Sequence, residues 1–241
     1  MSRSQRRRDA VVAFMARRWV WAPAMLIVVL ALAGVILRWV WLPQYRPRLR
    51  EGEVYGVDVS NHQGEIDWEA VAGDNIEFAF IKASEGGDFV DRRFTSNWEG
   101  ARAAGLEVGA YHFFTLCRPG AEQAANFLGV VPPGEADLAP ALDLEVRGNC
   151  SARPPADTVR AEVAAWIEKV EEETGRRVLL YVGPDFDSLY DITGKFSGPT
   201  WQRRILRRPP GERWEVWQLS YFADVHGIDG GVDLDVMRPP D

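Results

Sequence analysis

The stretch Ala139-Pro-Ala-Leu-Asp-Leu-Glu145 is a short apolar run that ends in two acidic residues. An apolar run of this length is typical of a buried strand. Residues i and i+2 of a strand point to the same face, so Asp143 and Glu145 should project into one small volume at the strand's C-terminal end. Two solvated acids at the end of a surface strand would give the same pattern, so this stretch alone leaves both interpretations open.

Strand-like and helix-like segments alternate on both sides of this stretch. The clearest helix is Asp157–Thr174, whose apolar residues form one stripe and which ends at Gly175. Shorter helices are expected near Phe94–Ala101 and over Pro119–Leu128. Strands are predicted at residues 54–59, 78–83, 106–114, 138–145, 177–182, 200–205, 214–219 and 232–236. About eight strands that alternate with helices indicate a parallel sheet, closed into a compact β/α barrel.

A barrel brings the C-terminal ends of its strands to one face, which is where barrel enzymes have their active sites. Acidic, aromatic and other polar residues recur at these predicted strand ends. They are Asp58, Lys82, Glu85, Tyr111, His112, Asp143, Glu145, Trp217, Gln218 and Asp233. The barrel prediction therefore requires the acids among them to converge.

The N-terminal region indicates a membrane segment. Residues 19–37 carry no charge, and Trp39-Val-Trp-Leu42 extends the apolar run past Arg38. About 20 residues span the hydrocarbon core of a bilayer, and pairs of Trp at both ends resemble an interfacial aromatic belt. We expect residues 1–18 to be a basic cytoplasmic tail, 19–42 a transmembrane signal anchor, 43–53 a linker and 54–241 the folded domain.

A cleaved signal peptide is the competing interpretation. Ala31-Leu-Ala33 before Gly34 has the small-x-small form of a cleavage site. Cleavage there would leave Val35-Ile-Leu37 and the second Trp pair on the mature chain, so the uncleaved anchor is favoured. Both interpretations place residues 51–241 outside the cytoplasm.

Charge is divided sharply along the chain. Residues 1–50 hold ten Arg and one acid, a net charge of +9, whereas residues 51–241 hold 18 Lys and Arg against 34 Asp and Glu, a net of −16. Nucleic-acid binding requires a basic face. The acidic folded part therefore argues against a nucleic-acid partner.

The chain has two cysteines, Cys117 and Cys150. An even number of cysteines in an exported domain permits a disulfide. Each cysteine follows a predicted strand, and the two strands are neighbours, so we expect the pair to bond and to tie two loops beside the strand-end acids. Two free buried thiols are the alternative.

Six ordered motifs in this chain resemble glycoside hydrolase family 25, the lysozyme (muramidase) family. They are GVDVSNHQG at 56–64, FAFIKASEG at 78–86, GAYHFF at 109–114, PALDLE at 140–145, WQLS at 217–220 and GVDLDV at 231–236. Together they cover essentially all of residues 54–237. The resemblance implies an irregular, TIM-like β/α barrel without a cofactor. It also implies hydrolysis of the β-1,4 bond between N-acetylmuramic acid and N-acetylglucosamine in bacterial peptidoglycan.

The resemblance carries roles onto particular residues. Glu145 matches the general acid, Asp143 its neighbour at the anomeric centre, and Asp58 and Asp233 the acids that line the same site. The candidate substrate-binding residues are Tyr111, Trp217, Glu85, His112 and Gln218. Among these, Tyr111 and Trp217 could instead be plain barrel packing, Glu85 a structural loop acid and His112 a hydrogen-bond partner behind the site. The chain departs from the family at Asp235, where Asn is frequent, and in the Arg-rich stretch 201–208.

Physical chemistry fits this assignment. Glycoside hydrolysis uses one protonated and one ionised carboxyl group, and neighbouring carboxylates favour protonation because like charges resist joint ionisation. Two routes remain open: Asp143 orients the substrate's 2-acetamido group as nucleophile, giving retention, or a carboxylate activates water, giving inversion. A wall-binding module without turnover and a metal-dependent hydrolase are the other function classes. Because the chain has no HExxH-type spacing, we predict no metal.

Overall fold

The computed structural model describes residues 5, 24–132, 134–211 and 213–239. The chain divides into two compact units, residues 1–45 and residues 46–241. The described part of the first unit is one helix, in which residues 24–36 are α-helical and η1 (Leu37–Trp41) is π-helical.

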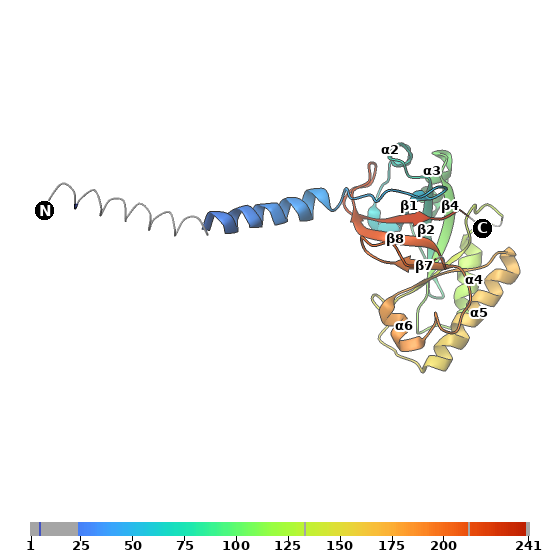
Figure 1. The fold of residues 1–241 in the computed structure, drawn as a ribbon. Coiled ribbons are helices and arrows are strands. Elements are labelled where there is room, and N and C mark those ends of the chain that lie inside the picture. The colour runs from blue at the N-terminus through green and yellow to red at the C-terminus, as the bar shows by residue number, and fades with distance from the viewer. Residues whose placement is uncertain (1–4, 6–23, 133, 212, 240–241) are drawn as a thin grey trace. The chain divides into compact units, whose positions relative to one another are not determined.

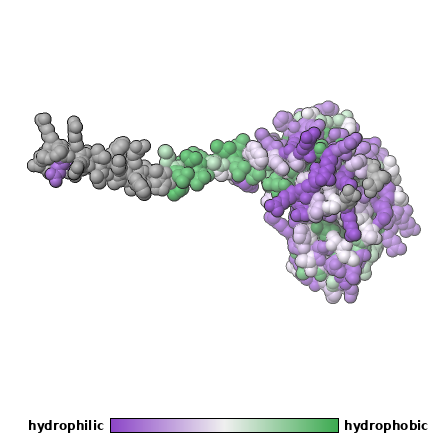
Figure 2. All heavy atoms as spheres, in the orientation of Figure 1, coloured by the Kyte–Doolittle hydropathy of each residue, from purple (hydrophilic) through white to green (hydrophobic). Residues whose placement is uncertain are grey.

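Apart from Arg38, the large side chains that this helix exposes are apolar. Ala24–Trp41 has 18 residues with a mean hydropathy of 2.3, which is enough to cross a membrane by length and composition, although a signal sequence would pass the same test. Figure 2 shows its hydrophobic side chains exposed as a continuous run. The tail predicted at 1–18, except residue 5, and positions 19–23 of the predicted span lie outside the described residues.

The second unit is a closed eight-stranded barrel, as the alternating pattern predicts. Its strands are β1 (Val54–Val59), β2 (Phe78–Glu85), β4 (Glu107–Phe113), β5 (Ala141–Leu144), β6 (Leu179–Val182), β7 (Thr200–Arg203), β8 (Trp214–Ala223) and β9 (Val232–Met237). They are hydrogen-bonded in the order β1-β9-β8-β7-β6-β5-β4-β2, and pairing of β1 with β2 closes the ring. The short β3 (Phe89–Val90) pairs with β2 outside the ring.

The expectation of an all-parallel sheet is wrong for β9. This strand runs antiparallel to both β1 and β8, whereas the other neighbouring strands of the ring are parallel. Only residues 224–231 connect β8 to β9, and a short connection of this kind forms a hairpin rather than a helical crossover. The N-terminal end of β9 therefore lies beside the C-terminal ends of the other strands, and Asp233 faces Asp58 across the pairing.

Helices cover only part of the barrel. They are α2 (Trp68–Gly73), α3 (Phe94–Ala103), α4 (Gly120–Val130), α5 (Ala156–Thr174) and α6 (Pro184–Tyr190), with the 3-10 turn η2 (Asn61–Gln63) after β1. Figure 1 shows α4 and α5 packed side by side. The helix α5 ends as predicted at Gly175, whose φ of 67° suits a residue without Cβ. Within the described residues no helix separates β7, β8 and β9, which makes the barrel irregular.

Alternation along the strands divides the core into two layers. Outward residues such as Val57, Ile81 and Leu142 join the large cluster beneath the helices. Inward residues of several strands form a smaller cluster inside the barrel, made of Phe78, Phe80, Leu138, Ala141, Leu179, Tyr181, Trp201 and Val216. The aromatic rings fill the lower part of the barrel, so the upper, C-terminal edge is the part that stays open.

The packing of aromatic rings inside the barrel requires a glycine at position 56. A Cβ added to Gly56 on β1 would lie 2.3 Å from the ring of Phe78, closer than real side chains approach. Glycine at this position therefore lets the Phe78 ring occupy the floor of the barrel.

Residues 46–53, which the sequence assigns to a linker, pack against the barrel. Arg46 forms an ion pair of 2.5 Å with Asp74, and Arg208 donates to both carboxylate oxygens of Glu53. The compact barrel unit thus begins before β1.

Candidate active site

A cavity of about 530 Å³ opens at the C-terminal edge of the barrel. The four predicted acids all line it: Asp58 from β1, Asp143 from β5, Glu145 just after β5 and Asp233 from β9. Strand alternation explains this convergence. Each acid lies two positions along its strand from a residue that faces the barrel interior, so the acid faces inward as well. The structure therefore brings together the acids that the barrel prediction requires to meet.

Glu145 is held by residues from the neighbouring strands. The guanidinium of Arg203 lies 2.8 Å from its Oε1 atom, and the hydroxyl of Tyr181 lies 3.4 Å from the same oxygen. Asn149 donates from Nδ2 to the backbone carbonyl of Glu145 at 3.0 Å and to that of Phe114 at 2.7 Å. These contacts fix both the carboxylate and the backbone of Glu145.

A chain of hydrogen bonds links the acids across the cavity. The Tyr181 hydroxyl lies 3.0 Å from Oε1 of Gln218 and donates to it, because the 3.4 Å contact with Glu145 is longer. The Gln218 Nε2 atom in turn donates to Oδ2 of Asp58 at 3.1 Å. Gln218 therefore lies where the sequence places it, as a polar group in the cavity wall.

Burial makes Asp143 and Asp233 hard to ionise. Desolvation and the charge of Glu145 raise the pKa of Asp143 well above its usual range, against the opposing charges of Lys82 and Arg203. Desolvation, followed by the charges of Asp58 and Glu145, raises the pKa of Asp233 to about 9. Asp143 and Asp233 therefore keep their protons to a higher pH than free carboxyl groups do.

One carboxylate oxygen at this cavity lacks a hydrogen-bond partner. Oδ1 of Asp143 is buried and has no hydrogen-bond partner among the described residues. Native proteins pair nearly all buried polar atoms. Because Asp143 also lines the cavity, its carboxyl group is suited to accept from a donor on a ligand.

The five predicted substrate-binding residues divide into two groups. Tyr111 and Gln218 line the cavity. The structure places Trp217 elsewhere: its ring is 1% exposed, packs against Trp214, and donates from Nε1 to the carbonyl of Arg204 at 2.7 Å. Because neighbouring residues of a strand face opposite sides, Gln218 in the cavity requires Trp217 outside the barrel wall, so we no longer expect Trp217 to contact a ligand.

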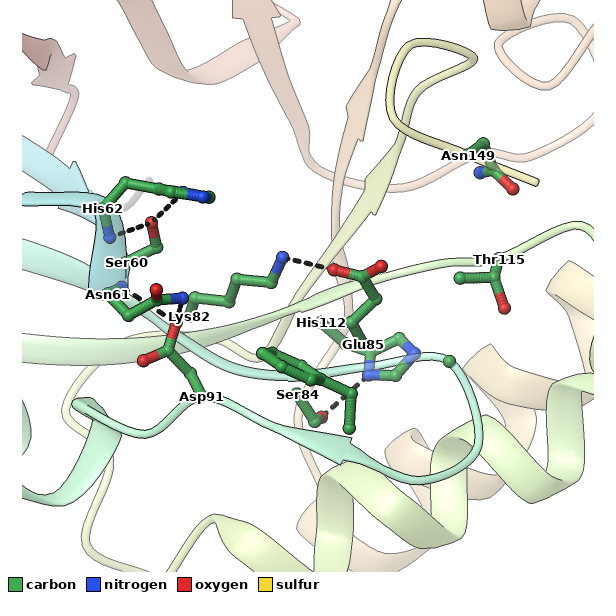
Figure 3. Close-up of polar contacts among 12 residues, drawn as sticks. Ser60, Asn61, His62, Lys82, Ser84, Glu85, Asp91, His112, Thr115 and Asn149 are labelled. Atoms are coloured by element: carbon green, nitrogen blue, oxygen red, sulfur yellow. Dashed lines mark hydrogen bonds and ion pairs between the residues drawn. The ribbon is translucent and has the colours of Figure 1, made fainter.

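Glu85 and His112 also lie outside the cavity wall. Figure 3 shows Glu85 turned to Lys82, whose Nζ atom is 2.7 Å from its carboxylate, and shows His112 beside Ser84. His112 is fully buried between its contacts to Ser84 at 2.8 Å and Gln123 at 3.3 Å, and burial lowers its pKa to about 3. The ring is therefore neutral and structural, which corresponds to the alternative interpretation of this residue.

Sequence reasoning missed several residues that line the cavity. They are Tyr181, Trp201, Arg203 and Tyr221. The inward positions of Tyr181 and Trp201 follow from alternation along β6 and β7 once the barrel is assumed. No sequence signal marks the pairing of Arg203 with Glu145, since it depends on how β7 lies against the loop after β5.

The predicted disulfide is present. Cys117 and Cys150 are bonded, with their Cα atoms 6.3 Å apart. The bond joins the loop after β4 to the loop after β5, which also carries Glu145 and Asn149. It therefore ties together two loops at the cavity edge. Within the described residues, no three His, Cys, Asp or Glu side chains form a group suited to a metal ion.

A barrel of this topology with an acidic cavity at its C-terminal edge is typical of glycoside hydrolases. Residues 57–228 match the model of Glycosyl hydrolases family 25. The chain belongs to this family and is a glycoside hydrolase.

Curated and solved relatives agree with the family match. The chain is 38% identical over 194 residues to the uncharacterized protein YegX of Escherichia coli K12, covering 77% of this chain and 70% of that one. It is 31% identical over 201 residues to Lysozyme M1 of Streptomyces globisporus, covering 75% and 66%. A solved family 25 glycosyl hydrolase from Bacillus anthracis superposes with a TM-score of 0.73 at 33% identity, covering 82% of this chain and 94% of that one.

Proposed function

We propose that this chain is a membrane-anchored muramidase that cleaves the β-1,4 bond between N-acetylmuramic acid and N-acetylglucosamine in bacterial peptidoglycan. Support for the reaction comes from the family membership, from the name of the lysozyme relative and from the acidic cavity. The cavity is open at the barrel edge, as a site for a polymer must be.

Glu145 is the proposed general acid. It lines the cavity, and the contacts of Arg203, Tyr181 and Asn149 hold it in one orientation. In the reaction its carboxyl group gives a proton to the glycosidic oxygen as the bond to the anomeric carbon breaks. Asp58 is proposed to stabilise the positive charge that develops on the sugar ring. Asp233, whose pKa of about 9 keeps it protonated at neutral pH, is proposed to take part in catalysis by hydrogen-bonding to Asp58.

The unpaired Oδ1 atom of Asp143 is the observation that best supports a part for the substrate's 2-acetamido group in the reaction. The N–H of a 2-acetamido group is the donor that this buried acceptor lacks. By holding that N–H, Asp143 would aim the acetamido oxygen at the anomeric carbon, and the substrate would supply its own nucleophile. Such a route retains the anomeric configuration.

The bond specificity is tested by the products. Purified peptidoglycan is digested with the detergent-solubilised full-length protein, reduced with borohydride and examined by mass spectrometry. A muramidase leaves reduced N-acetylmuramic acid ends, whereas reduced N-acetylglucosamine ends would contradict the assignment. Intact glycan that sediments with the protein would favour the second candidate, a wall-binding module without turnover.

The stereochemical route is tested by the first product formed. Proton NMR of a fresh digest of a soluble glycan fragment distinguishes the anomers before they interconvert. The β anomer is expected. An initial α anomer would mean that water attacks directly, and Asp143 would then have a different part in the reaction.

The anchor and the domain organisation are proposed on the sequence and on the apolar helix. Residues 19–42 are the proposed single span, with residues 1–18 in the cytoplasm, 43–53 as a connector and 54–241 outside the inner membrane. Carbonate washing of membranes from expressing cells tests this. The full chain should stay in the membrane pellet at its full mass, and a soluble product shortened after residue 33 would identify a cleaved signal peptide.

A further inference from the structure

Asp235 on β9 is the most deeply buried acid in the barrel. Its side chain is 0% exposed and lies on the inner face, two residues beyond Asp233. The indole Nε1 of Trp201 donates to its Oδ1 atom at 2.9 Å. Its Oδ2 atom is buried and has no hydrogen-bond partner among the described residues. A buried acid with one unmatched oxygen is costly, so it requires an explanation.

The strand register shows which side chains lie beside Asp235. Across the antiparallel pairing, Asp235 is opposite Gly56 and Asp233 is opposite Asp58. Gly56 has no side chain, so the inward neighbours of Asp235 on β1 are the diagonal residues Val54 and Asp58, of which only Asp58 is polar. On β8 the residue opposite Asp235 is Gln218. Asp58 is itself 9% exposed, and one of its oxygens already accepts from Gln218.

We propose that Asp235 is a positioning residue, which shares a single proton with Asp58 and thereby fixes the Asp58 carboxyl group at the floor of the cavity. One proton between the two groups gives the unmatched oxygen of Asp235 its partner. The sharing of the proton is independent of the proposed reaction, whereas its effect on turnover rests on the proposed function.

Electrostatics favours one proton on this pair. Burial and the charge of Asp235 raise the pKa of Asp58 well above its usual range, and burial and the charge of Asp233 raise the pKa of Asp235. Two such groups titrate as a pair and lose their protons in two steps. Once the first proton has left, the remaining proton is held by both groups and leaves only at high pH. The rings of Phe80 and Trp201, 4.8 Å apart, line the barrel interior beneath the cavity.

Other charged and titratable groups face the pair from the surrounding strands. They are Lys82 on β2, Tyr111 on β4, Asp143 and Glu145 at β5, Tyr181 on β6, Arg203 on β7 and Asp233 on β9, while β8 contributes the uncharged Gln218. The protonation of the pair is therefore measured as a difference between the wild type and variants at position 235, because the surrounding groups are present in all of these proteins.

The first test needs no substrate. Infrared spectra of the detergent-solubilised full-length protein are recorded from pH 5 to pH 9, with the C=O band reporting protonated carboxyl groups. At pH 7 the band of Asp235→Asn should be smaller than that of the wild type by one group, because the amide donates to Asp58 in place of the proton. An unchanged band would show that no proton is shared, whatever the reaction of the enzyme.

The second test measures turnover with the two variants Asp235→Asn and Asp235→Leu. In Asp235→Asn the pH profile of kcat should shift by about one unit or more, since Asp58 loses a like-charged neighbour. In Asp235→Leu, which leaves Asp58 with no polar group at position 235, kcat should fall roughly 10- to 100-fold with little change in KM. A Leu variant with the kcat and pH profile of the wild type would show that Asp235 only fills space.

Folding is followed by thermal unfolding of the same variants. Asp235→Asn should be about as stable as the wild type because the amide can keep both contacts, whereas Asp235→Leu should be less stable because it leaves the buried Nε1 donor of Trp201 without a partner. Asn97→Leu is the matched control, since Asn97 on α3 is 3% exposed and its Nδ2 also has no partner among the described residues. This control should leave the pH profile of kcat unchanged.

Discussion

The guanidinium of Arg203 lies 2.8 Å from the carboxylate of Glu145 and joins β7 to the loop that follows β5. Both side chains are partly exposed, at 35% and 21%, and both line the cavity. An ion pair this exposed contributes little to stability. Its importance therefore lies in the orientation that it gives to Glu145.

Loss of Arg203 should slow the reaction more than it destabilises the fold. In Arg203→Ala the Glu145 side chain loses its nearest partner, and misplacement of a reacting group by about 1 Å costs up to roughly 100-fold in rate. We expect kcat on soluble glycan fragments to fall 10- to 100-fold by that estimate, with Arg203→Lys intermediate because ammonium lacks the planar fork.

A surface ion pair provides the control for this prediction. Arg102 on α3 contacts Glu135 at 2.7 Å and does not line the cavity. Arg102→Ala should leave kcat unchanged. Equal kcat values for the wild type and Arg203→Ala would show that Glu145 needs no help from Arg203.

The contribution of Asp233 to the stability of the barrel should fall as pH rises above about 4. The pKa of Asp233 is about 9 in the folded protein, and a free Asp has a pKa of about 3.9. Between these values the unfolded chain has released a proton that the folded one retains, so each step up in pH favours unfolding. Urea unfolding at pH 5, 7 and 9 measures the slope, which Asp233→Asn should make shallower. An equal slope in the variant would mean that Asp233 titrates normally.

His112 should destabilise the fold at acid pH. Burial lowers its pKa to about 3, from about 6.5 in a free imidazole. Below about pH 6.5, His112 therefore binds a proton in the unfolded chain but stays neutral in the folded one. This difference lowers the stability of the fold as the pH falls from about 6.5 toward 3. The ring carbon shifts of His112 in NMR spectra should stay constant between pH 5 and 8. A titration inside that window would place the ring in contact with solvent.

Reduction of the Cys117–Cys150 bond should lower the stability of the barrel. The two cysteines are 33 residues apart, and removal of a native disulfide from a small exported domain typically costs about 2–5 kcal/mol. Urea unfolding with and without a phosphine reductant measures this difference. The double variant Cys117→Ser, Cys150→Ser should match the reduced protein and should not respond to the reductant.

The acid cluster could be predicted from the sequence because it depends on periodicity alone. Asp143 and Glu145 share a face of one strand, and Asp58 ends another, so closing the barrel is enough to bring them together. The same alternation argues against the prediction that Trp217 contacts sugar, because its neighbour Gln218 takes the inward position.

Other features could not be predicted because they depend on geometry between distant segments. The direction of β9 is set by the hairpin at 224–231, and the contact of Arg203 with Glu145 spans 58 residues. The helices α2 and α6 are only 6 and 7 residues long, too short for apolar periodicity to mark them.

General-acid catalysis by Glu145 is the central claim, and a change of leaving group tests it most directly. Glu145→Gln is assayed on peptidoglycan and on an aryl glycoside of the same sugar, whose phenolate leaves without needing a proton. Glu85→Gln is the control, because Glu85 pairs with Lys82 and does not line the cavity.

The account predicts that Glu145→Gln loses roughly 100- to 10,000-fold in kcat on peptidoglycan and far less on the aryl glycoside. The control should hydrolyse both substrates like the wild type. Equal losses on the two substrates, or full activity of Glu145→Gln on peptidoglycan, would contradict the claim that Glu145 gives its proton to the leaving oxygen.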